Sequence, residues 1–336
     1  MDFDFSDEQY MLRDSVRDFL QKDCTPGEVR RIWEDDTGRS PERWKKLGEM
    51  GVLGLTIPEA DGGAGMDEVD LVLLLEEAGR NLLPEPLLEH TAVGAPLLAR
   101  AGSEAQKAEW LPRATTGQAT ISIGLAGQPY VQDATADVVI IEENGELHAA
   151  TQDRLSLTPL KSVDGARRLF KVTAELDDAT RMSSANGQAQ WAFDHAAAAT
   201  AAELVGVADA MLQRTIAYAK EREQFGRKIG SFQGIQHKLA ETFLLVESAK
   251  SAVYYAAYAL ARGLDDAPIH VSVAKAYAGD AERRANYEAL QIHGGIGFTW
   301  EHDLHLWLKR GRALEAQYGD SDWHRRRIAD WVYAAG

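Results

Sequence analysis

The 336-residue chain lacks several features that would place it in other protein classes. Its single cysteine, Cys24, cannot form a disulfide within the chain, which fits a reducing cytoplasm, and a small buried residue is a commoner role for it than a nucleophile. No apolar run approaches the roughly 20 residues that span a bilayer. The longest clear run is Leu71 to Leu75, and the acidic start, Met1 to Phe5, is unlike a signal peptide. We therefore expect a soluble, cytoplasmic protein.

Basic residues are scarce, with 36 Lys and Arg against 52 Asp and Glu, a net charge of −16. The excess of acidic residues is unevenly distributed along the chain. Residues 1–190 hold 19 basic and 34 acidic residues (net −15), whereas residues 191–336 hold 17 and 18 (net −1). Because an acidic chain repels phosphates, this composition argues against nucleic-acid binding. The apolar fraction of 45% and the charged fraction of 26% are typical of a globular protein.

Apolar spacing and helix-start signals predict helices over the first 115 residues. Ser6 precedes two acidic residues and an amphipathic pattern, which indicates a capped helix. Pro41 follows a serine and predicts the start of a helix over 41–50. A further helix is expected over 67–80, and Pro84 breaks it.

The middle and the last part of the chain have different patterns. Segments 119–125, 137–141 and 169–172 are rich in strand-forming residues, and Asn144-Gly145 is a two-residue hairpin signal. Long alanine-rich helical patterns follow, including the apolar stripe Leu239, Phe243 and Val246. We expect a mainly α-helical chain with a small β domain: an N-terminal helical domain over 1–115, a reduced β domain over 116–190 and a C-terminal helical bundle over 191–336.

Two segments of the C-terminal part have residue types suited to anionic ligands. Residues 222–233 combine a helix end, a glycine turn and the basic cluster Arg222, Arg227 and Lys228, which could meet phosphates. In residues 291–298, several glycines let backbone N–H groups approach an anion closely. Taken singly, the first segment is better explained as a capped helix followed by a solvated basic turn, and the second is a weak signal that fits a glycine loop between helices.

In combination and in this order, the motifs resemble the acyl-CoA dehydrogenase family over nearly the whole chain. The segments that carry the resemblance are Asp7–Gln9, Leu47–Gly51, Ile57–Glu59, Gly62–Met66, Glu76–Arg80, Arg222–Gly226, Phe232-Gln233 and Gln291–Phe298. The resemblance implies a fold with a helical domain, a β domain and a C-terminal four-helix bundle. It also implies FAD between two subunits, its flavin ring held mainly by one β domain and its ADP part by the neighbour's bundle. The implied cofactor-binding residues are Arg222, Gln224, Phe232, Gln233, Gln291, Gly294 and Gly295.

The chain departs from this family at the catalytic base, a carboxylate that removes the proton α to the thioester. The two usual base positions correspond to Tyr318 and Ala196. Neither is acidic, and tyrosine, with a pKa of about 10, is a poor base at neutral pH. Glu315, Asp320 and Glu203 are nearby carboxylates, for which surface or cap roles are commoner. The catalytic residues are therefore not assigned from the sequence.

The flavin-holding part of the resemblance is also weak. Residues 124–130 stand where the family has a Thr-Glu-Pro…Gly-Ser-Asp stretch, and the β domain is several dozen residues short. The chain resembles the short subunits of bacterial α2β2 heterotetramers of this family, some of which act on CoA thioesters of steroid side chains. The leading prediction is a subunit in fatty acid or steroid degradation that completes the FAD site of a longer, base-carrying chain. The resemblance implies α,β-desaturation of an acyl-CoA and an electron-transferring flavoprotein as acceptor.

Two other functions stay open. One is a self-sufficient homo-oligomeric dehydrogenase with an unusual base such as Glu315 or Glu203, and the other is a CoA-binding or scaffold subunit without flavin. His302 and His305 have acidic neighbours, but zinc requires three or four convergent ligands, so no metal is expected. Tyr254, Tyr255 and Tyr258 are interpreted as core residues or as the lining of an acyl pocket.

Overall fold

The computed structural model describes residues 4–35, 37–182 and 187–334. Residues 1–3, on which the expectation for the start of the chain partly rests, lie outside this set. Contacts divide the chain into two compact units. The first comprises Met1–Val29, Val72–Leu83 and Thr200–Gly336, and the second comprises Arg30–Leu71 and Pro84–Ala199. The division into domains at 1–115, 116–190 and 191–336 stays a prediction.

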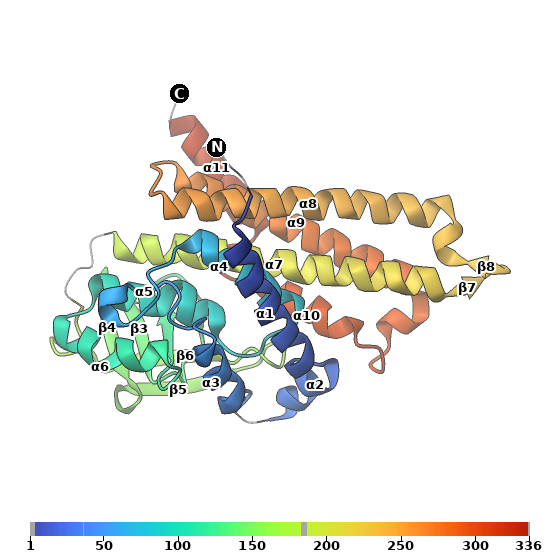
Figure 1. Cartoon of the computed structure of the whole chain (residues 1–336). Helices are drawn as coiled ribbons and strands as arrows, with labels where there is room; N and C mark the ends of the chain where they lie inside the picture. Colours follow the sequence, from blue (N-terminus) through green and yellow to red (C-terminus); the bar gives the residue numbers. More distant parts are fainter. Residues whose placement is uncertain (1–3, 36, 183–186, 335–336) are drawn as a thin grey trace. The chain divides into compact units, whose positions relative to one another are not determined.

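The first unit is a helical bundle (Figure 1). Ser6 starts its first helix through a complete capping box with Gln9, as predicted. The long helices α8 and α9 lie side by side and antiparallel, and the short β7–β8 hairpin lies at one end of the bundle (Figure 1). Its elements are α1 (Asp7–Asp23), parts of α4 (Glu68–Arg80) and α7 (Gln188–Glu221), β7 (Glu223–Gln224), β8 (Arg227–Lys228), η4 (Ile229–Ser231), α8 (Gln233–Ala261), α9 (Ala267–His293), η5 (Gly294–Phe298), α10 (Leu304–Ala316) and α11 (Ser321–Ala334).

The second unit combines short helices with two small sheets. In the first sheet β1 pairs parallel with β3, and β3 pairs antiparallel with β4. The second sheet is antiparallel in the order β2-β6-β5. The elements of the second unit are most of α2 (Pro26–Glu34), α3 (Pro41–Glu49), η1 (Glu59–Asp61), η2 (Leu88–Gly94), α5 (Ala95–Ala101), α6 (Glu104–Thr115), β1 (Ile121–Gly124), β2 (Val131–Gln132), β3 (Val138–Glu143), β4 (Glu146–Thr151), η3 (Gln152–Arg154), β5 (Leu155–Leu160) and β6 (Leu169–Ala174).

Local signals account for much of this unit. Ser40 caps α3 and Pro41 occupies its first turn, as predicted. Asn144 and Gly145 join β3 to β4 with φ angles of 54° and 81°, the left-handed pair that a two-residue hairpin turn requires. The sequence did not indicate β2, which has two residues, or β5, whose Pro159 is atypical of a strand.

One expected core position is wrong. Phe243 is 50% exposed, although the apolar stripe on its helix predicted burial. The buried residues of α8 include Thr242, Val246, Ala249 and Val253, which recur every three or four positions and leave Phe243 on the outer face. Cys24 is buried, in keeping with the role of a small packed residue. Within the described ranges, the length and hydropathy needed to cross a bilayer do not coincide in any helix.

The helices α4 and α7 cross in direct backbone contact inside the first unit. A Cβ atom on Gly79 would overlap the carbonyl oxygen of Glu203, and one on Gly206 would overlap the carbonyl oxygen of Glu76. Only glycine on both helices permits this approach, because any side chain would push the two backbones apart.

The Arg80 side chain connects the charged groups beside this crossing. It donates to Glu76 at 2.6 Å and to Glu77 at 3.1 Å, and it forms an ion pair with Asp209 of α7. The Tyr254 hydroxyl of α8 donates to Glu76 Oε2 at 2.6 Å. The motif Glu76–Arg80 is therefore a structural junction between α4, α7 and α8.

We expect Gly206→Ala to lower the free energy of unfolding by about 1–3 kcal/mol, because the added methyl group overpacks the crossing. Gly234→Ala is the matched control, since a Cβ atom on Gly234 of α8 would meet no atom within 4 Å. Urea denaturation of both variants measures the difference. Equal stability of the two variants would show that the α4–α7 contact tolerates a side chain.

Candidate functional site

The first candidate motif forms a compact hairpin between α7 and α8. Phe225 and Gly226 make its turn, with φ angles of 54° and 75°. The Lys228 ammonium group contacts the Glu223 carboxylate at 2.8 Å and donates to the carbonyl oxygen of Glu221 at 2.9 Å. The Arg227 guanidinium lies 4.0 Å from the centroid of the Phe232 ring. These contacts fix the hairpin without using the side chain of Arg222.

The second candidate motif forms the end of α9 and the turn that follows it. Gly294 has a φ of 63°, which ends the helix in a conformation that favours glycine. The ring of His293 stacks on Tyr218, in the last turns of α7, with centroids 4.2 Å apart and planes 19° apart. The two motifs therefore lie at one end of the first unit (Figure 1).

The stacked rings of Tyr218 and His293 join the ends of α7 and α9, although these two residues are far apart in the sequence.

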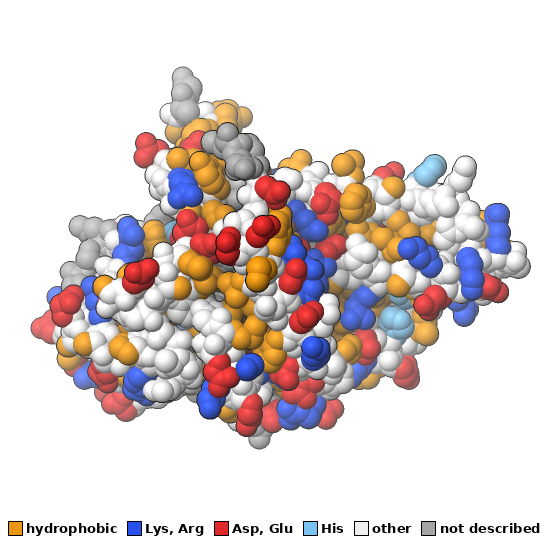
Figure 2. Space-filling view, viewed as in Figure 1, with side chains coloured by type: hydrophobic (Ala, Val, Ile, Leu, Met, Phe, Trp, Pro, Cys, Tyr) orange, Lys and Arg blue, Asp and Glu red, His pale blue; other side chains and the backbone are white. Residues whose placement is uncertain are grey.

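The predicted cofactor residues form an open, polar surface. Arg222, Gln224, Gln233, Gln291 and Gly295 are exposed, and Phe232 and Gly294 are half-buried. No described residue forms a hydrogen bond or ion pair with the side chains of Arg222, Gln233 or Gln291, whereas the Gln224 amide donates to the Glu223 carbonyl oxygen at 2.7 Å. Figure 2 shows Lys and Arg side chains gathered at this end of the bundle.

This surface fits the phosphate-bearing part of FAD. A Cβ atom on Gly294 or Gly295 would meet no atom within 4 Å, so the backbone there is open to a ligand. A guanidinium group and two amides without protein partners supply hydrogen-bond donors for an anion. The structure thus brings the seven predicted cofactor residues to one end of the first unit, and their role in binding stays a prediction.

The first base position, Tyr318, lies in the turn between α10 and α11. Its side chain is 4% exposed and its φ angle is 52°. The buried Lys275 ammonium group donates to the carbonyl oxygens of Glu315 at 2.9 Å and Gly319 at 2.7 Å. His324 Nε2 donates to the carbonyl oxygen of Tyr318 at 2.9 Å. Lys275 and His324 therefore fix this turn from inside the bundle, and the phenol group of Tyr318 is buried.

The neighbouring carboxylates are engaged in local structure. Glu315 Oε1 accepts hydrogen bonds from the backbone N–H and the hydroxyl of Ser321, at 3.2 Å and 3.1 Å, and contacts Arg283 at 3.0 Å. Asp320 accepts from the backbone N–H of Trp323 at 2.7 Å, at the start of α11. Glu203 is buried in α7 beside the α4–α7 crossing.

The second base position, Ala196, is fully buried in the second unit. Its neighbour His195 contacts Glu68 at 2.9 Å through Nε2 and the Trp191 carbonyl oxygen at 2.8 Å through Nδ1. Both ring nitrogens are therefore occupied by contacts within the chain.

Three buried ionisable groups around the Tyr318 turn were not indicated by the sequence. Burial lowers the pKa of Lys275 to about 8 and that of His324 to about 3. Burial raises the pKa of Glu282 to about 8, so this carboxyl group is largely protonated at neutral pH. The only local signal was their spacing: Lys275 and Glu282 lie seven residues apart, on the alanine-rich face of α9.

The loop between β1 and β2 contains the segment predicted to correspond to the family's flavin-binding stretch. The backbone N–H of Ala126 donates to the Glu142 carboxylate at 2.9 Å. Beside the loop, the buried Arg167 contacts Glu89 at 3.3 Å and also donates to the Gln132 side chain. Glu142 and Arg167 thus have partners within the chain.

His302, just before α10, and His305, in its first turn, have structural contacts. His302 Nδ1 accepts from the backbone N–H of Leu304 at 3.2 Å, and His305 stacks on Trp300 with ring centroids 4.3 Å apart. Across residues 4–35, 37–182 and 187–334, no three His, Cys, Asp or Glu side chains converge on a common point that could hold a metal ion.

The fold and these motifs define an acyl-CoA dehydrogenase. The family model of the acyl-CoA dehydrogenase N-terminal domain matches residues 6–118, and that of the C-terminal domain matches residues 186–333. The chain therefore belongs to this family of oxidoreductases, and the expected fold, mainly α with a small β domain, is confirmed. FAD-dependent dehydrogenation is the general chemistry of the family.

The chain is similar to particular members over most of its length. It is 36% identical to acyl-CoA dehydrogenase IpdE2 of Mycobacterium tuberculosis, covering 90% of this chain and 91% of that protein. It is 33% identical to IpdE2 of Mycolicibacterium smegmatis, covering 98% and 100%. Among solved structures, the ChsE4-ChsE5 complex from Mycobacterium tuberculosis includes a chain with a TM-score of 0.90 and 26% identity, with 99% of both chains covered.

The pKa of Glu282 predicts a specific pH dependence of stability. In the unfolded chain this carboxyl group loses its proton near its ordinary pKa of 4.5, but in the folded state it keeps the proton up to about pH 8. The folded state therefore binds more protons between these values, and this group makes stability fall as pH rises through that window. We expect Glu282→Gln to reduce the fall between pH 5 and pH 8 by about 1–3 kcal/mol.

Urea denaturation at several pH values measures this effect, with Glu301→Gln, at an exposed position, as the control. If wild type and Glu282→Gln lose stability in parallel from pH 5 to pH 8, the buried carboxyl group does not set the pH dependence.

Proposed function

We propose that this chain is the short subunit of a FAD-dependent acyl-CoA dehydrogenase that catalyses α,β-desaturation of an acyl-CoA thioester. In this proposal the chain completes the FAD site of a longer partner chain, and the partner supplies the catalytic base. The observation that carries it is a contrast within one bundle: Arg222, Gln233 and Gln291 are exposed without protein partners, whereas the base position holds a buried tyrosine.

The residues at the open end would hold the ADP part of FAD. The Arg222 guanidinium would pair with the pyrophosphate, since its planar donors match phosphate oxygens. Gln233 and Gln291 would donate further hydrogen bonds, and the backbone at Gly294 and Gly295 leaves room for close approach. FAD supplies the hydride acceptor of the reaction when it is bound.

The proton step needs a carboxylate that this chain does not offer at either family position. Tyr318 is enclosed, and the turn that carries it is fixed by Lys275 and His324. Glu315 and Asp320 already accept hydrogen bonds that stabilise the start of α11. These contacts favour a base from another chain over the alternative of a self-sufficient enzyme.

The comparisons support a heteromeric assembly and a steroid-type substrate. One structural relative is described as the ChsE4-ChsE5 complex, and another, with a TM-score of 0.88 and 25% identity, as the Tcur3481-Tcur3483 steroid ACAD. From this similarity we propose that the chain also assembles with a longer partner chain. We propose further that its acyl-CoA substrate carries a steroid-derived group. An electron-transferring flavoprotein as acceptor and a cytoplasmic location remain predictions from the resemblance and the composition.

Expression with and without a longer acyl-CoA dehydrogenase chain from the same genome tests the proposal. We expect the chain alone to bind little FAD, and the co-purified complex to carry FAD and to reduce a dye in the presence of acyl-CoA. Full FAD loading together with dehydrogenase activity in a homo-oligomer of this chain would contradict the proposal.

Arg222→Ala tests the cofactor surface. In the complex we expect at least a ten-fold weaker affinity for FAD, because a charge-assisted pair with the pyrophosphate contributes about 1.5–3 kcal/mol. Arg326→Ala, at an exposed position on α11, is the matched control and should leave flavin content unchanged. Flavin absorbance per complex gives the readout, and equal flavin content in both variants would exclude Arg222 from the site.

A further inference from the structure

His293 is a buried aromatic residue at the junction of α9 and η5, between Gln291 and the turn Gly294–Gly295. It is 5% exposed, and its Nδ1 donates to the Ala289 carbonyl oxygen at 2.8 Å, which fixes the orientation of the ring. Burial lowers the pKa of His293, so the ring is neutral at neutral pH.

The residues that follow His293 pack against it. A Cβ atom on Gly297 would lie 3.0 Å from the Cβ atom of His293, so the η5 turn folds back onto this residue. The ring of His302 meets the ring of His293 edge-on, with centroids 5.0 Å apart and planes 67° apart. His293 therefore packs against the turn that contains Gly294 and Gly295.

Tyr218 is the aromatic partner of His293 on α7. The backbone N–H of Arg222 donates to the Tyr218 carbonyl oxygen at 2.8 Å, so Arg222 follows Tyr218 by one helical turn. The Tyr218 ring stacks on His293, whereas its hydroxyl group has no hydrogen-bond partner among the described residues. The contact between the two helices at this point therefore depends on the ring and not on the hydroxyl group.

We propose that Tyr218 and His293 are positioning residues, which set the separation between Arg222 and the segment Gln291–Gly295. The inference rests on the proposed function, in which this surface holds the ADP part of FAD. A pyrophosphate group has fixed dimensions, so the donors that bind it must be held at a fixed separation. The side chains of Arg222 and Gln291 form no hydrogen bond or ion pair with a described residue, so they do not set this separation themselves.

The affinity of the co-purified complex for FAD tests the proposal, measured by titrating FAD into the complex after its flavin has been removed. We expect Tyr218→Leu to raise the dissociation constant about five-fold or more, because the loss of the stack lets the two segments move apart. His293→Leu removes the same stack and should weaken binding at least as much. Tyr218→Phe keeps the ring and should restore the dissociation constant to within about two-fold of wild type.

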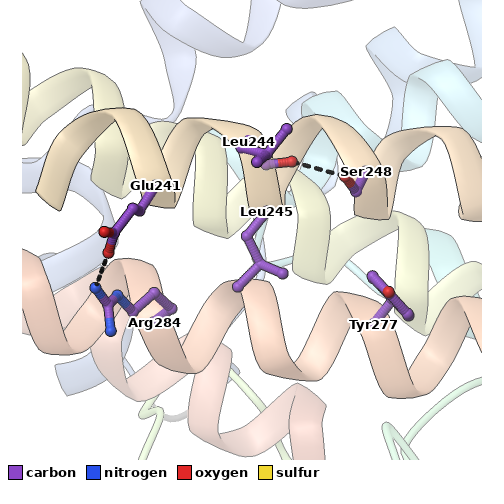
Figure 3. A pocket seen from close by; sticks show the side chains of 6 residues that line it. All are labelled: Glu241, Leu244, Leu245, Ser248, Tyr277 and Arg284. Atoms are coloured by element: carbon purple, nitrogen blue, oxygen red, sulfur yellow. Dashed lines mark hydrogen bonds and ion pairs between the residues drawn. The ribbon is translucent and has the colours of Figure 1, made fainter. Parts of the chain in front are cut away.

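Tyr277→Leu is the matched control, because it makes the same change elsewhere on α9. Tyr277 lines the groove between α8 and α9 together with Leu245 (Figure 3). It precedes His293 by 16 residues, about 24 Å along the helix. Val253→Ala is a control for lost stability, since Val253 is 2% exposed in α8, 20 residues beyond Gln233. It should lower the unfolding temperature, and both controls should leave the affinity for FAD unchanged.

A double-mutant cycle separates positioning from general destabilisation. Tyr218→Leu should cost less affinity in the Arg222→Ala background than in wild type, since the group that it positions is already absent. Equal losses in the two backgrounds, or an unchanged dissociation constant for Tyr218→Leu, would overturn the proposal.

The proposed function and this inference fail in different ways. If the wild-type complex binds FAD and Arg222→Ala weakens binding, but Tyr218→Leu has no effect, the proposed function is retained and positioning by the stacked rings is rejected. A wild-type complex that does not bind FAD would reject both.

Discussion

The backbone contact between α4 and α7 is the constraint on which the first unit depends. Gly79 and Gly206 allow each helix to lie against a carbonyl oxygen of the other, and no other residue type would fit. This approach places Asp209 of α7 beside Arg80, which already pairs with Glu76 and Glu77 of its own helix, so that charges from two helices are paired where they are partly removed from water. From Gly206, α7 continues for 15 residues, about 22 Å, to the end where the candidate cofactor residues begin.

Polar side chains of this bundle have two opposite environments. At the end of α7 and α9, the side chains of Arg222 and Gln291 are exposed and form no hydrogen bond or ion pair with a described residue. Water can hydrate them there, so this costs little until a ligand replaces the water. Around Tyr318, by contrast, Lys275 and His324 satisfy backbone carbonyl groups from inside the bundle. The first arrangement suits a ligand from outside, and the second suits a rigid turn.

This contrast explains why an acyl-CoA dehydrogenase fold need not contain a complete active site. Fold and catalytic residues are separable, because the packing of the helices does not require a carboxylate at the base position. In our proposal the chain keeps the part of the site that binds phosphate and leaves proton transfer to a partner.

The sequence determined the features whose causes lie within a few residues. The Ser6 cap, the start of α3 at Pro41 and the Asn144-Gly145 turn depend on local backbone geometry, and each was predicted correctly. The family resemblance further gave the fold and the candidate cofactor residues, because their motifs are read in order along the chain.

Only the tertiary structure decided which side chains are buried and what they contact. The sequence predicted burial of Phe243, which is exposed, and gave no sign that Lys275 and Glu282 are enclosed. Nor could it show that the ring of Tyr218 stacks on that of His293, or that Gly79 meets α7. Burial and charge pairing depend on residues distant in the chain, and their positions are set by helix packing rather than by neighbouring residues.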